Sequence, residues 1–82
     1  MMVLNQAGTA IVGVDDASFV RITPVGGRAR VEKLAYGSHI YLGEYREYSK
    51  AIDVLKAMTE AWASGGKLFE MPPDGRKECD LW

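Results

Sequence analysis

Apolar and polar residues alternate with a period of two along much of the first 45 residues. This spacing, with many β-branched and aromatic side chains, is typical of short β-strands. Glycine and aspartate interrupt the runs, as is usual at tight turns. The pattern therefore predicts five strands, over Met2–Gln6, Ala10–Asp15, Ser18–Val25, Arg28–Tyr36 and His39–Tyr45.

Two glycine-containing dipeptides predict how three of these strands pair. Gly26-Gly27 and Gly37-Ser38 each suit a two-residue hairpin turn, because glycine adopts positive φ without a Cβ clash. The first turn predicts the pairs Val25–Arg28, Thr23–Arg30, Ile22–Val31 and Arg21–Glu32. The second predicts the pairs Tyr36–His39, Ala35–Ile40, Leu34–Tyr41 and Lys33–Leu42. The two turns are interpreted independently, yet together they give one coherent apolar face.

From Glu47 to Ser64 the period changes to about 3.6, which predicts one amphipathic helix. Its apolar stripe, with Leu55 near the centre, consists of Ala51, Val54, Leu55, Met58, Ala61 and Trp62. Gly65-Gly66 is a helix stop signal, because glycine accepts the left-handed conformation after a helix. Lys67–Met71 is long enough for one last short strand.

Together these elements predict an α+β fold. We expect an antiparallel β-sheet of about five to six short strands, with the one helix packed on one face. Residues 1–73 form the single domain in this interpretation, and residues 74–82 form a flexible C-terminal tail.

Alternation divides the hairpin side chains between two faces of the sheet. The face for the helix carries Val20, Ile22, Ala29, Val31, Ala35, Ile40 and Leu42, with Lys33 as the one misfit. The opposite face carries Phe19, Arg21, Thr23, Arg28, Arg30, Glu32, Leu34, Tyr36, His39, Tyr41 and Tyr45. Arg21 has Glu32 as a cross-strand partner, whereas Arg28 and Arg30 have no acidic partner in this register.

This outer face is richer in arginine and aromatic residues than solubility requires. Such a composition is typical of interface cores, and it also suits an anionic ligand that contains a ring. A third interpretation is that aromatic residues are simply common in strands. The predicted ligand-binding residues are Arg21, Arg28, Arg30, Tyr36, Tyr41 and Tyr45.

Composition excludes several classes of function. The chain has 82 residues, with ten basic and eleven acidic side chains, and it lacks the basic patch of a nucleic-acid-binding protein. No apolar run is long enough to cross a membrane, and the single cysteine fits a reducing compartment, so we expect a cytoplasmic protein. Because so short a chain buries a thin core, a homo-oligomer is expected.

We expect no catalytic residue, no metal site and no cofactor. His39 beside a turn has no positioned partner and nucleophile. Asp15-Asp16 is weak as a cation site, since adjacent side chains point apart. Cys79 shows no sign of activation. The sequence therefore predicts a protein that is not an enzyme.

Three stretches resemble a largely uncharacterised family of short proteins frequent in Firmicutes genomes and their prophages. They are VLNQAGTAIVGVDD at Val3–Asp16, IYLGEYREYSKAIDVLKAMTEAW at residues 40–62, and KLFEMP at residues 67–72. The resemblance implies an opening hairpin that pairs with the L-G-E-Y strand, Leu42–Tyr45. It further implies an A-x-x-V-L helix and a closing strand that ends in F-x-M-P. Glu47-Tyr48-Ser49 departs from the family pattern at the start of the helix.

That family is also similar in size and outline to prophage proteins that sequester cyclic nucleotide signals of bacterial immunity, the Thoeris anti-defence sponges. No binding residue is carried over from them. The resemblance implies a phage or mobile-element protein that sequesters a nucleotide-derived immune signal. The alternative is a protein–protein interaction module or an inhibitor of a host protein.

Overall fold

The computed structural model describes residues 1–15 and 18–74 of the chain. It has an α+β fold, as the sequence predicts, with six strands and one helix in the described part. The elements are β1 (Met2–Leu4), β2 (Ile11–Gly13), β3 (Phe19–Val25), β4 (Arg28–Ala35), β5 (Ser38–Tyr45), α1 (Tyr48–Ala63) and β6 (Leu68–Glu70). Each lies within two residues of a segment predicted from the periodicity, because that signal is local.

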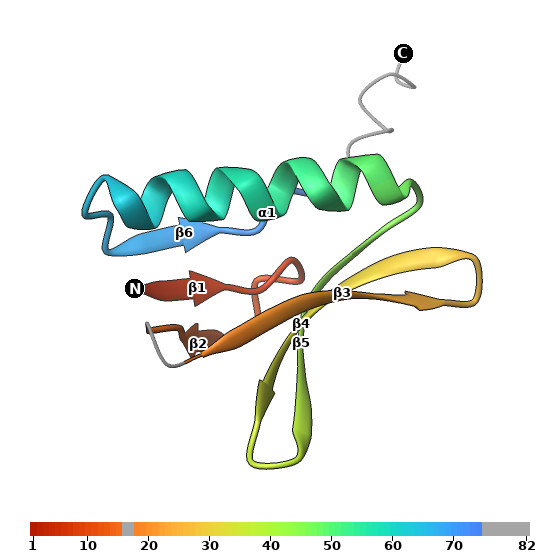
Figure 1. Ribbon diagram of the computed structural model, residues 1–82, viewed down its shortest axis with the longest axis horizontal. Helices are drawn as coiled ribbons and strands as arrows, with labels where there is room; N and C mark the ends of the chain where they lie inside the picture. The colour runs from red at the N-terminus through yellow and green to blue at the C-terminus, as the bar shows by residue number, and fades with distance from the viewer. Residues whose placement is uncertain (16–17, 75–82) are drawn as a thin grey trace.

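The strands form two sheets of three strands, and the prediction of a single five- to six-stranded sheet is wrong. In the first sheet, β1 pairs antiparallel with β2 and parallel with β6, in the order β2-β1-β6. The second sheet has the order β3-β4-β5 (Figure 1). The chain leaves β2 at Gly13 and begins β3 at Phe19 in the other sheet. Hydrophobic alternation predicts strands, but it does not say which strands pair.

The first hairpin of the second sheet has the predicted register. β3 pairs with β4 through Val25–Arg28, Thr23–Arg30, Ile22–Val31 and Arg21–Glu32. In the second hairpin, the turn is Tyr36-Gly37 instead of Gly37-Ser38, so that Ala35 pairs with Ser38 and Glu32 with Tyr41. Gly37 therefore takes the second turn position, where φ is +80° and glycine is favoured most, while Tyr36 has a φ of +51°. The register moves by two residues in total, so the faces near this turn remain as predicted.

A β-bulge in β5 changes the faces beyond that point. The register shifts between Val31 and Glu32, where Val31 pairs with Gly43 while Glu32 pairs with Tyr41, and Leu42 is the extra residue. After the bulge, Tyr45 pairs with Ala29 on the inner face and Glu44 with Arg30 on the outer face. The extra residue therefore exchanges the predicted directions of the last side chains of β5.

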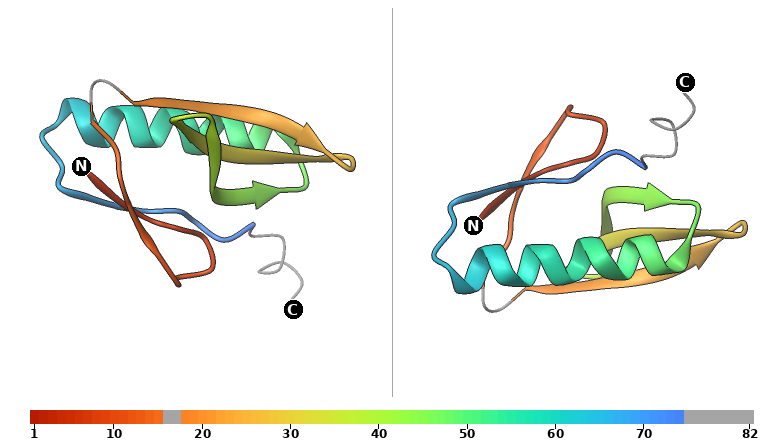
Figure 2. Two further views of the ribbon diagram at one scale, coloured as in Figure 1. Left: turned by 90° about the horizontal axis from the view of Figure 1, so that it is seen from below. Right: turned by 90° about the horizontal axis from the view of Figure 1, so that it is seen from above.

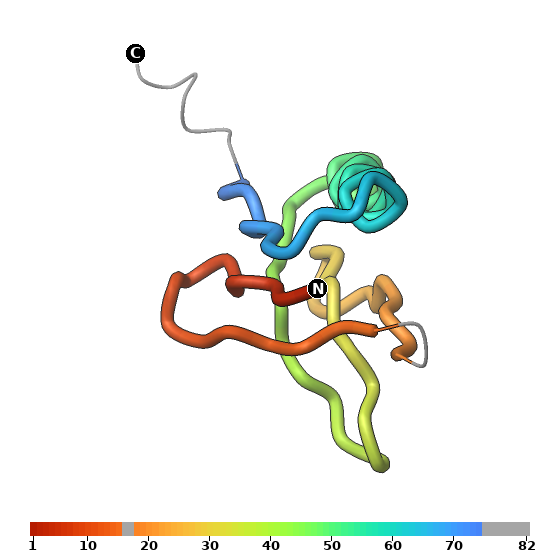
Figure 3. Tube along the Cα trace, turned by 90° about the vertical axis from the view of Figure 1, so that its left-hand side faces the viewer, coloured from red at the N-terminus to blue at the C-terminus, as the bar shows by residue number. Residues whose placement is uncertain are grey.

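α1 lies across the inner face of sheet β3-β4-β5, and sheet β2-β1-β6 lies beside both the helix and that sheet (Figures 2 and 3). The core between these layers consists of Val3, Val14, Ala29, Val31, Leu42, Tyr45, Ala51, Val54, Met58 and Met71. Leu55, predicted at the centre of the helix stripe, is only half-buried at the edge of this core. The helix ends as predicted, because Gly65, with a φ of +81°, turns the chain so that its N–H donates to the Trp62 carbonyl.

Gln6 connects the two sheets at the bulge. Its backbone N–H donates to the Leu42 carbonyl at 2.7 Å and so links the opening hairpin to the L-G-E-Y strand. Its side-chain Oε1 accepts from the Glu44 N–H at 2.9 Å, and its Nε2 donates to the Pro72 carbonyl at 3.2 Å. The pairing implied by the family resemblance is therefore a contact through one residue and not a strand ladder.

Asp74, the first residue of the predicted flexible tail, is held in place in the structure. Its Oδ2 accepts from the Arg46 backbone N–H at 3.3 Å and lies 3.6 Å from Arg46 Nε. The rest of the predicted tail, with Cys79, lies outside the described residues, and so does Asp16 of the Asp15-Asp16 pair.

Candidate ligand-binding site

The six residues predicted to bind a ligand do not gather at one place. Arg28, Arg30 and Tyr41 lie together on the outer face of sheet β3-β4-β5, the face turned away from α1. Arg21 lies beside them on the same face, where it binds Glu32. Tyr36 is in the turn between β4 and β5 with a fully exposed side chain, and Tyr45 is in the core.

The prediction that Tyr45 projects from the outer face is wrong. Its side chain is 0% exposed, and its hydroxyl donates a hydrogen bond of 2.7 Å to the Pro72 carbonyl. Burial in the core, together with the nearby Tyr41 and Asp74, raises the pKa of Tyr45 well above its usual range. The β-bulge is the physical reason, because it turns Tyr45 inward by one step of the alternation.

The same bulge gives Arg28 and Arg30 an acidic partner, contrary to the sequence prediction. Glu44 comes to lie opposite Arg30, and its two oxygens lie 3.0 Å from Arg28 Nε and 3.4 Å from Arg30 Nη2. Asp74 extends the group, with Oδ2 3.9 Å from Arg28 Nη2 and 3.6 Å from Arg46 Nε. We call Arg28, Arg30, Arg46, Glu44 and Asp74 the arginine cluster.

Arg30 is the best-enclosed cation of the arginine cluster. Its guanidinium carbon lies 5.9 Å from the centre of the Tyr41 ring, which is within the range of a cation–π contact. Its Nε is buried and has no hydrogen-bond partner among the described residues. A buried donor without a partner is unusual in a folded protein.

Tyr41 is fixed in position beside Arg30. Its hydroxyl donates to Gln6 Oε1 at 3.0 Å, so the Tyr41 ring is anchored to the segment that follows β1. Partial burial and the charge of Glu44 raise the pKa of Tyr41, while Arg30 acts in the opposite direction. Tyr41 is therefore a neutral hydrogen-bond donor, and part of its ring remains exposed to solvent.

Glu32 is a nearly buried carboxylate in the middle of the outer face, where its residue is 3% exposed. Its Oε2 accepts from Thr23 Oγ1 at 2.8 Å and from Arg21 Nε at 3.3 Å, and it lies 3.3 Å from His39 Nδ1. Burial raises the pKa of Glu32, but the hydrogen bonds from Thr23 and Arg21 and the nearby charges of His39 and Arg21 outweigh this effect. The net result is a pKa of Glu32 below its ordinary value.

This lowered pKa predicts a loss of stability in acid. Glu32 takes up a proton at a higher pH in the unfolded chain than in the folded chain. The stability that the ionised Glu32 carboxylate contributes is therefore complete above the ordinary glutamate pKa, and it disappears as the pH falls through the pKa of Glu32 in the folded protein. We expect the Tm of the wild type to fall more steeply from about pH 5 to about pH 3 than the Tm of Glu32→Gln. Calorimetry across this range checks the prediction, and equal slopes for the two proteins would contradict it.

Between residues 1–15 and 18–74, no three histidine, cysteine, aspartate or glutamate side chains form a group that could hold a metal ion. His39 faces Glu32 across the strands, beside Leu34 in the ladder. Among the same residues, no helix has the length and apolar character needed to pass through a bilayer.

Sequence reasoning missed Gln6, Glu44, Arg46 and Asp74. One signal was present for Glu44, because a glycine inside a strand often marks a bulge, and Gly43 lies between Leu42 and Glu44. A Cβ atom at Gly43 would lie 3.1 Å from Met71 Cε and 3.2 Å from the Tyr45 hydroxyl oxygen, so a side chain there would require these neighbours to move by a few tenths of an ångström. No local pattern indicates Gln6 or Asp74, whose contacts with β5 and the segment after it span 38 and 28 positions.

No family model matches this chain, and comparison with the curated proteins and with the solved structures found no match.

Proposed function

We propose that this chain is a non-enzymatic binding protein whose arginine cluster binds the phosphate of a nucleotide-derived ligand. In its specific form, drawn from the prophage resemblance, it is a cytoplasmic protein of a phage or mobile element that sequesters a nucleotide signal of host immunity. Arg28 and Arg30 hold the phosphate, and the exposed part of the Tyr41 ring offers a surface for the base.

The observation that carries this proposal is the incomplete neutralisation of the arginine cluster. Within the described part of the chain, three guanidinium groups share the two carboxylates of Glu44 and Asp74. A bound phosphate supplies the missing negative charge and accepts from the exposed N–H groups of the three arginine side chains, which are 37–56% exposed.

The existing ion pairs leave donors for such a ligand. Each guanidinium carries five N–H groups, and the contacts with Glu44 and Asp74 engage one or two nitrogens of each arginine. Glu44 lies between Arg28 and Arg30 and holds the two side chains side by side. This pre-orders both guanidinium groups, which reduces the entropy lost when a phosphate binds.

Arg30→Ala is expected to weaken binding of the ligand at least ten-fold, about 1.4 kcal/mol. Isothermal titration with cyclic dinucleotides, cyclic ADP-ribose isomers, AMP and inorganic phosphate identifies the ligand and measures its affinity. Arg28→Ala should show a loss of similar size. The Tm of both variants should stay near that of the wild type, since half-exposed ion pairs contribute at most about 1 kcal/mol.

Lys56→Ala is the matched control, because it removes one positive charge from the exposed side of α1 and should leave binding unchanged. Affinity should also fall as the salt concentration rises. If no nucleotide in the series binds, or if both arginine variants bind as the wild type does, the arginine cluster is not the ligand site.

The second candidate is the protein-interaction module, and a different surface favours it. The register of sheet β2-β1-β6 places four apolar side chains on its outer side, namely Met2, Leu4, Ile11 and Leu68. Met2, Ile11 and Leu68 are each more than 40% exposed. Contiguous exposed apolar residues often mark a protein contact. In this case Ile11→Arg would abolish capture of a host protein from infected-cell extract, while Arg30→Ala would not.

A further inference from the structure

Among the described strands, β3 has a partner on one edge only. It is hydrogen-bonded to β4 on one side and lies at the margin of its sheet. In an antiparallel ladder, alternate residues bond to the neighbour, and the two-residue turn makes Val25 and Arg28 a bonded pair. Counting back from Val25, the N–H and C=O groups of Val20 and Ile22 point away from β4.

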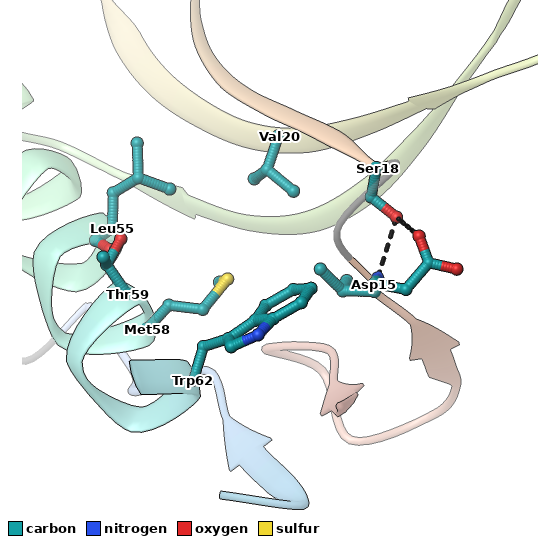
Figure 4. A pocket seen from close by; sticks show the side chains of 8 residues that line it. Asp15, Ser18, Val20, Leu55, Met58, Thr59 and Trp62 are labelled. Carbon is teal, nitrogen blue, oxygen red and sulfur yellow. Dashed lines mark hydrogen bonds between the residues drawn. The ribbon is translucent and has the colours of Figure 1, made fainter. Parts of the chain in front are cut away.

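An apolar groove runs beside this edge, between β3 and α1 (Figure 4). It contains a hollow of about 260 Å³, lined on the strand side by Val14 and Val20 and on the helix side by Leu55, Met58 and Trp62. Ser18 and Asp15 close one end, where Ser18 Oγ donates to Asp15 Oδ1 at 3.1 Å. The hollow therefore offers apolar side chains to whatever covers the β3 edge.

The groove continues along the helix. Leu55, Thr59 and Trp62 lie on the side of α1 that borders β3. Residues spaced by three and four positions share a helix face, so Tyr48 and Ile52 lie on the same side, nearer the start of the helix. These five side chains are exposed or half-buried, and Thr59 is their one polar member. β3 and α1 run alongside each other in opposite directions (Figures 1 and 2). A helix flank of this composition normally packs against another element.

We propose that β3 pairs antiparallel with β3 of a second copy of the chain, which gives a two-fold symmetric dimer with a continuous six-stranded sheet. Val20 of each copy then exchanges two backbone hydrogen bonds with Ile22 of the other copy, and the two-fold axis passes beside Arg21. The α1 helices lie on the same side of the joined sheet, and their Tyr48-to-Trp62 flanks face each other across the groove.

The groove requires a strand with apolar side chains on the inner side and polar side chains on the outer side, and β3 has this pattern. Val20 and Ile22 point inward, whereas Arg21 and Thr23 point outward beside the polar outer face. In the proposed register, Thr23 covers the Phe19 ring of the second copy, which is 58% exposed in the single chain. The two Arg21 side chains meet at the axis, each neutralised by its own Glu32 at 3.3 Å.

Pro24 favours this register over its neighbour. It has no N–H, so a register centred on Ile22 would place Val20 opposite a residue that cannot donate. In the register centred on Arg21, Val20 and Ile22 supply the N–H donors, and Pro24 lies outside these pairs. In this register residues 19–23 of the two strands lie opposite each other over about 17 Å, and the facing α1 flanks are about 23 Å long. A band about 20 Å deep then buries about 700–900 Å² for both copies together, which is at the small end of specific interfaces.

A disulfide test reports this register directly. Residues at the axis form a non-hydrogen-bonded pair with Cα atoms about 4.5 Å apart, within the range that a disulfide bridges. Arg21→Cys, made together with Cys79→Ser, should therefore form a covalent dimer under mild oxidation. Thr23→Cys with Cys79→Ser is the matched control on the same strand and face, and it should remain uncrosslinked because the two copies of residue 23 lie about 13 Å apart.

Light scattering at micromolar concentration should give twice the chain mass for the wild type. Val20→Pro removes an N–H needed for pairing, and Thr59→Arg places a charge in the groove, so each should raise the dimer dissociation constant at least ten-fold. Ala57→Arg adds the same charge to an exposed position of α1 and should remain dimeric. Circular dichroism verifies that the variants are folded, and the cysteine pair tests the register even if Val20→Pro fails to fold.

A wild type with the mass of one chain would overturn the proposal. So would a dimer that survives both Val20→Pro and Thr59→Arg and that does not crosslink through residue 21. A monomer that captures a peptide with the sequence of residues 18–25 would assign the groove to a strand from another protein and would likewise exclude the second copy.

Discussion

Tyr45→Ala is expected to lower the free energy of unfolding by about 3–5 kcal/mol, the range for removal of a large aromatic side chain from a core. Tyr45 is among the largest fully buried side chains. It pairs with Ala29 within its own sheet, and its hydroxyl donates to Pro72 in the segment that follows β6. A chain of this size has about 5 kcal/mol of stability, so the variant should be largely unfolded at room temperature.

Two further tyrosine variants separate the causes of this loss. Tyr45→Phe keeps the ring and removes the 2.7 Å hydrogen bond, which should cost about 1 kcal/mol. Tyr36→Ala removes a fully exposed ring and should leave the Tm within a few degrees of the wild type. Urea denaturation followed by circular dichroism measures all three. A Tyr45→Ala protein as stable as Tyr36→Ala would mean that β5 has no bulge and that Tyr45 lies on the outer face.

Gln6→Ala should destabilise the protein by about 2–3 kcal/mol, although the residue is only partly buried. The amide makes three hydrogen bonds, to the Glu44 N–H, the Tyr41 hydroxyl and the Pro72 carbonyl. Its loss leaves the Glu44 N–H at the bulge without its acceptor and removes one of the side-chain connections between the two sheets, while the bond from Lys33 Nζ to the Gly13 carbonyl remains. Because Glu44 also orients Arg28 and Arg30, ligand affinity should fall together with stability.

Tyr41→Phe is the control for Gln6→Ala, because it removes one of the same hydrogen bonds at a partly exposed position and should cost less than about 1 kcal/mol. Amide hydrogen exchange gives a sharper measurement, since the Glu44 N–H should lose protection in Gln6→Ala and retain it in Tyr41→Phe. Equal stability of the two variants would show that Gln6 does not hold the bulge.

Part of the candidate site was predictable from the sequence. The Gly26-Gly27 turn and strict alternation placed Arg21, Arg28 and Arg30 on one face, next to Glu32 and Thr23, and the structure has them there. The pairing of Arg28 and Arg30 with Glu44 was not predictable in this way. One inserted residue at Leu42 reverses the alternation for the end of β5, and it exchanged the expected places of Glu44 and Tyr45.

The sequence by itself determined the α+β class, the approximate bounds of six strands and one helix, the first hairpin register and the end of the helix at Gly65. Each of these depends on residues close together in the chain, where periodicity and backbone preferences act. Only the tertiary structure decided that the strands divide into two sheets, that β6 joins β1 in parallel, and that β5 contains a bulge. Those features join positions that are far apart in the chain, such as Leu4 with Glu70 in the parallel ladder and Tyr45 with Pro72 beside the bulge. A local pattern carries no signal for contacts between such distant positions.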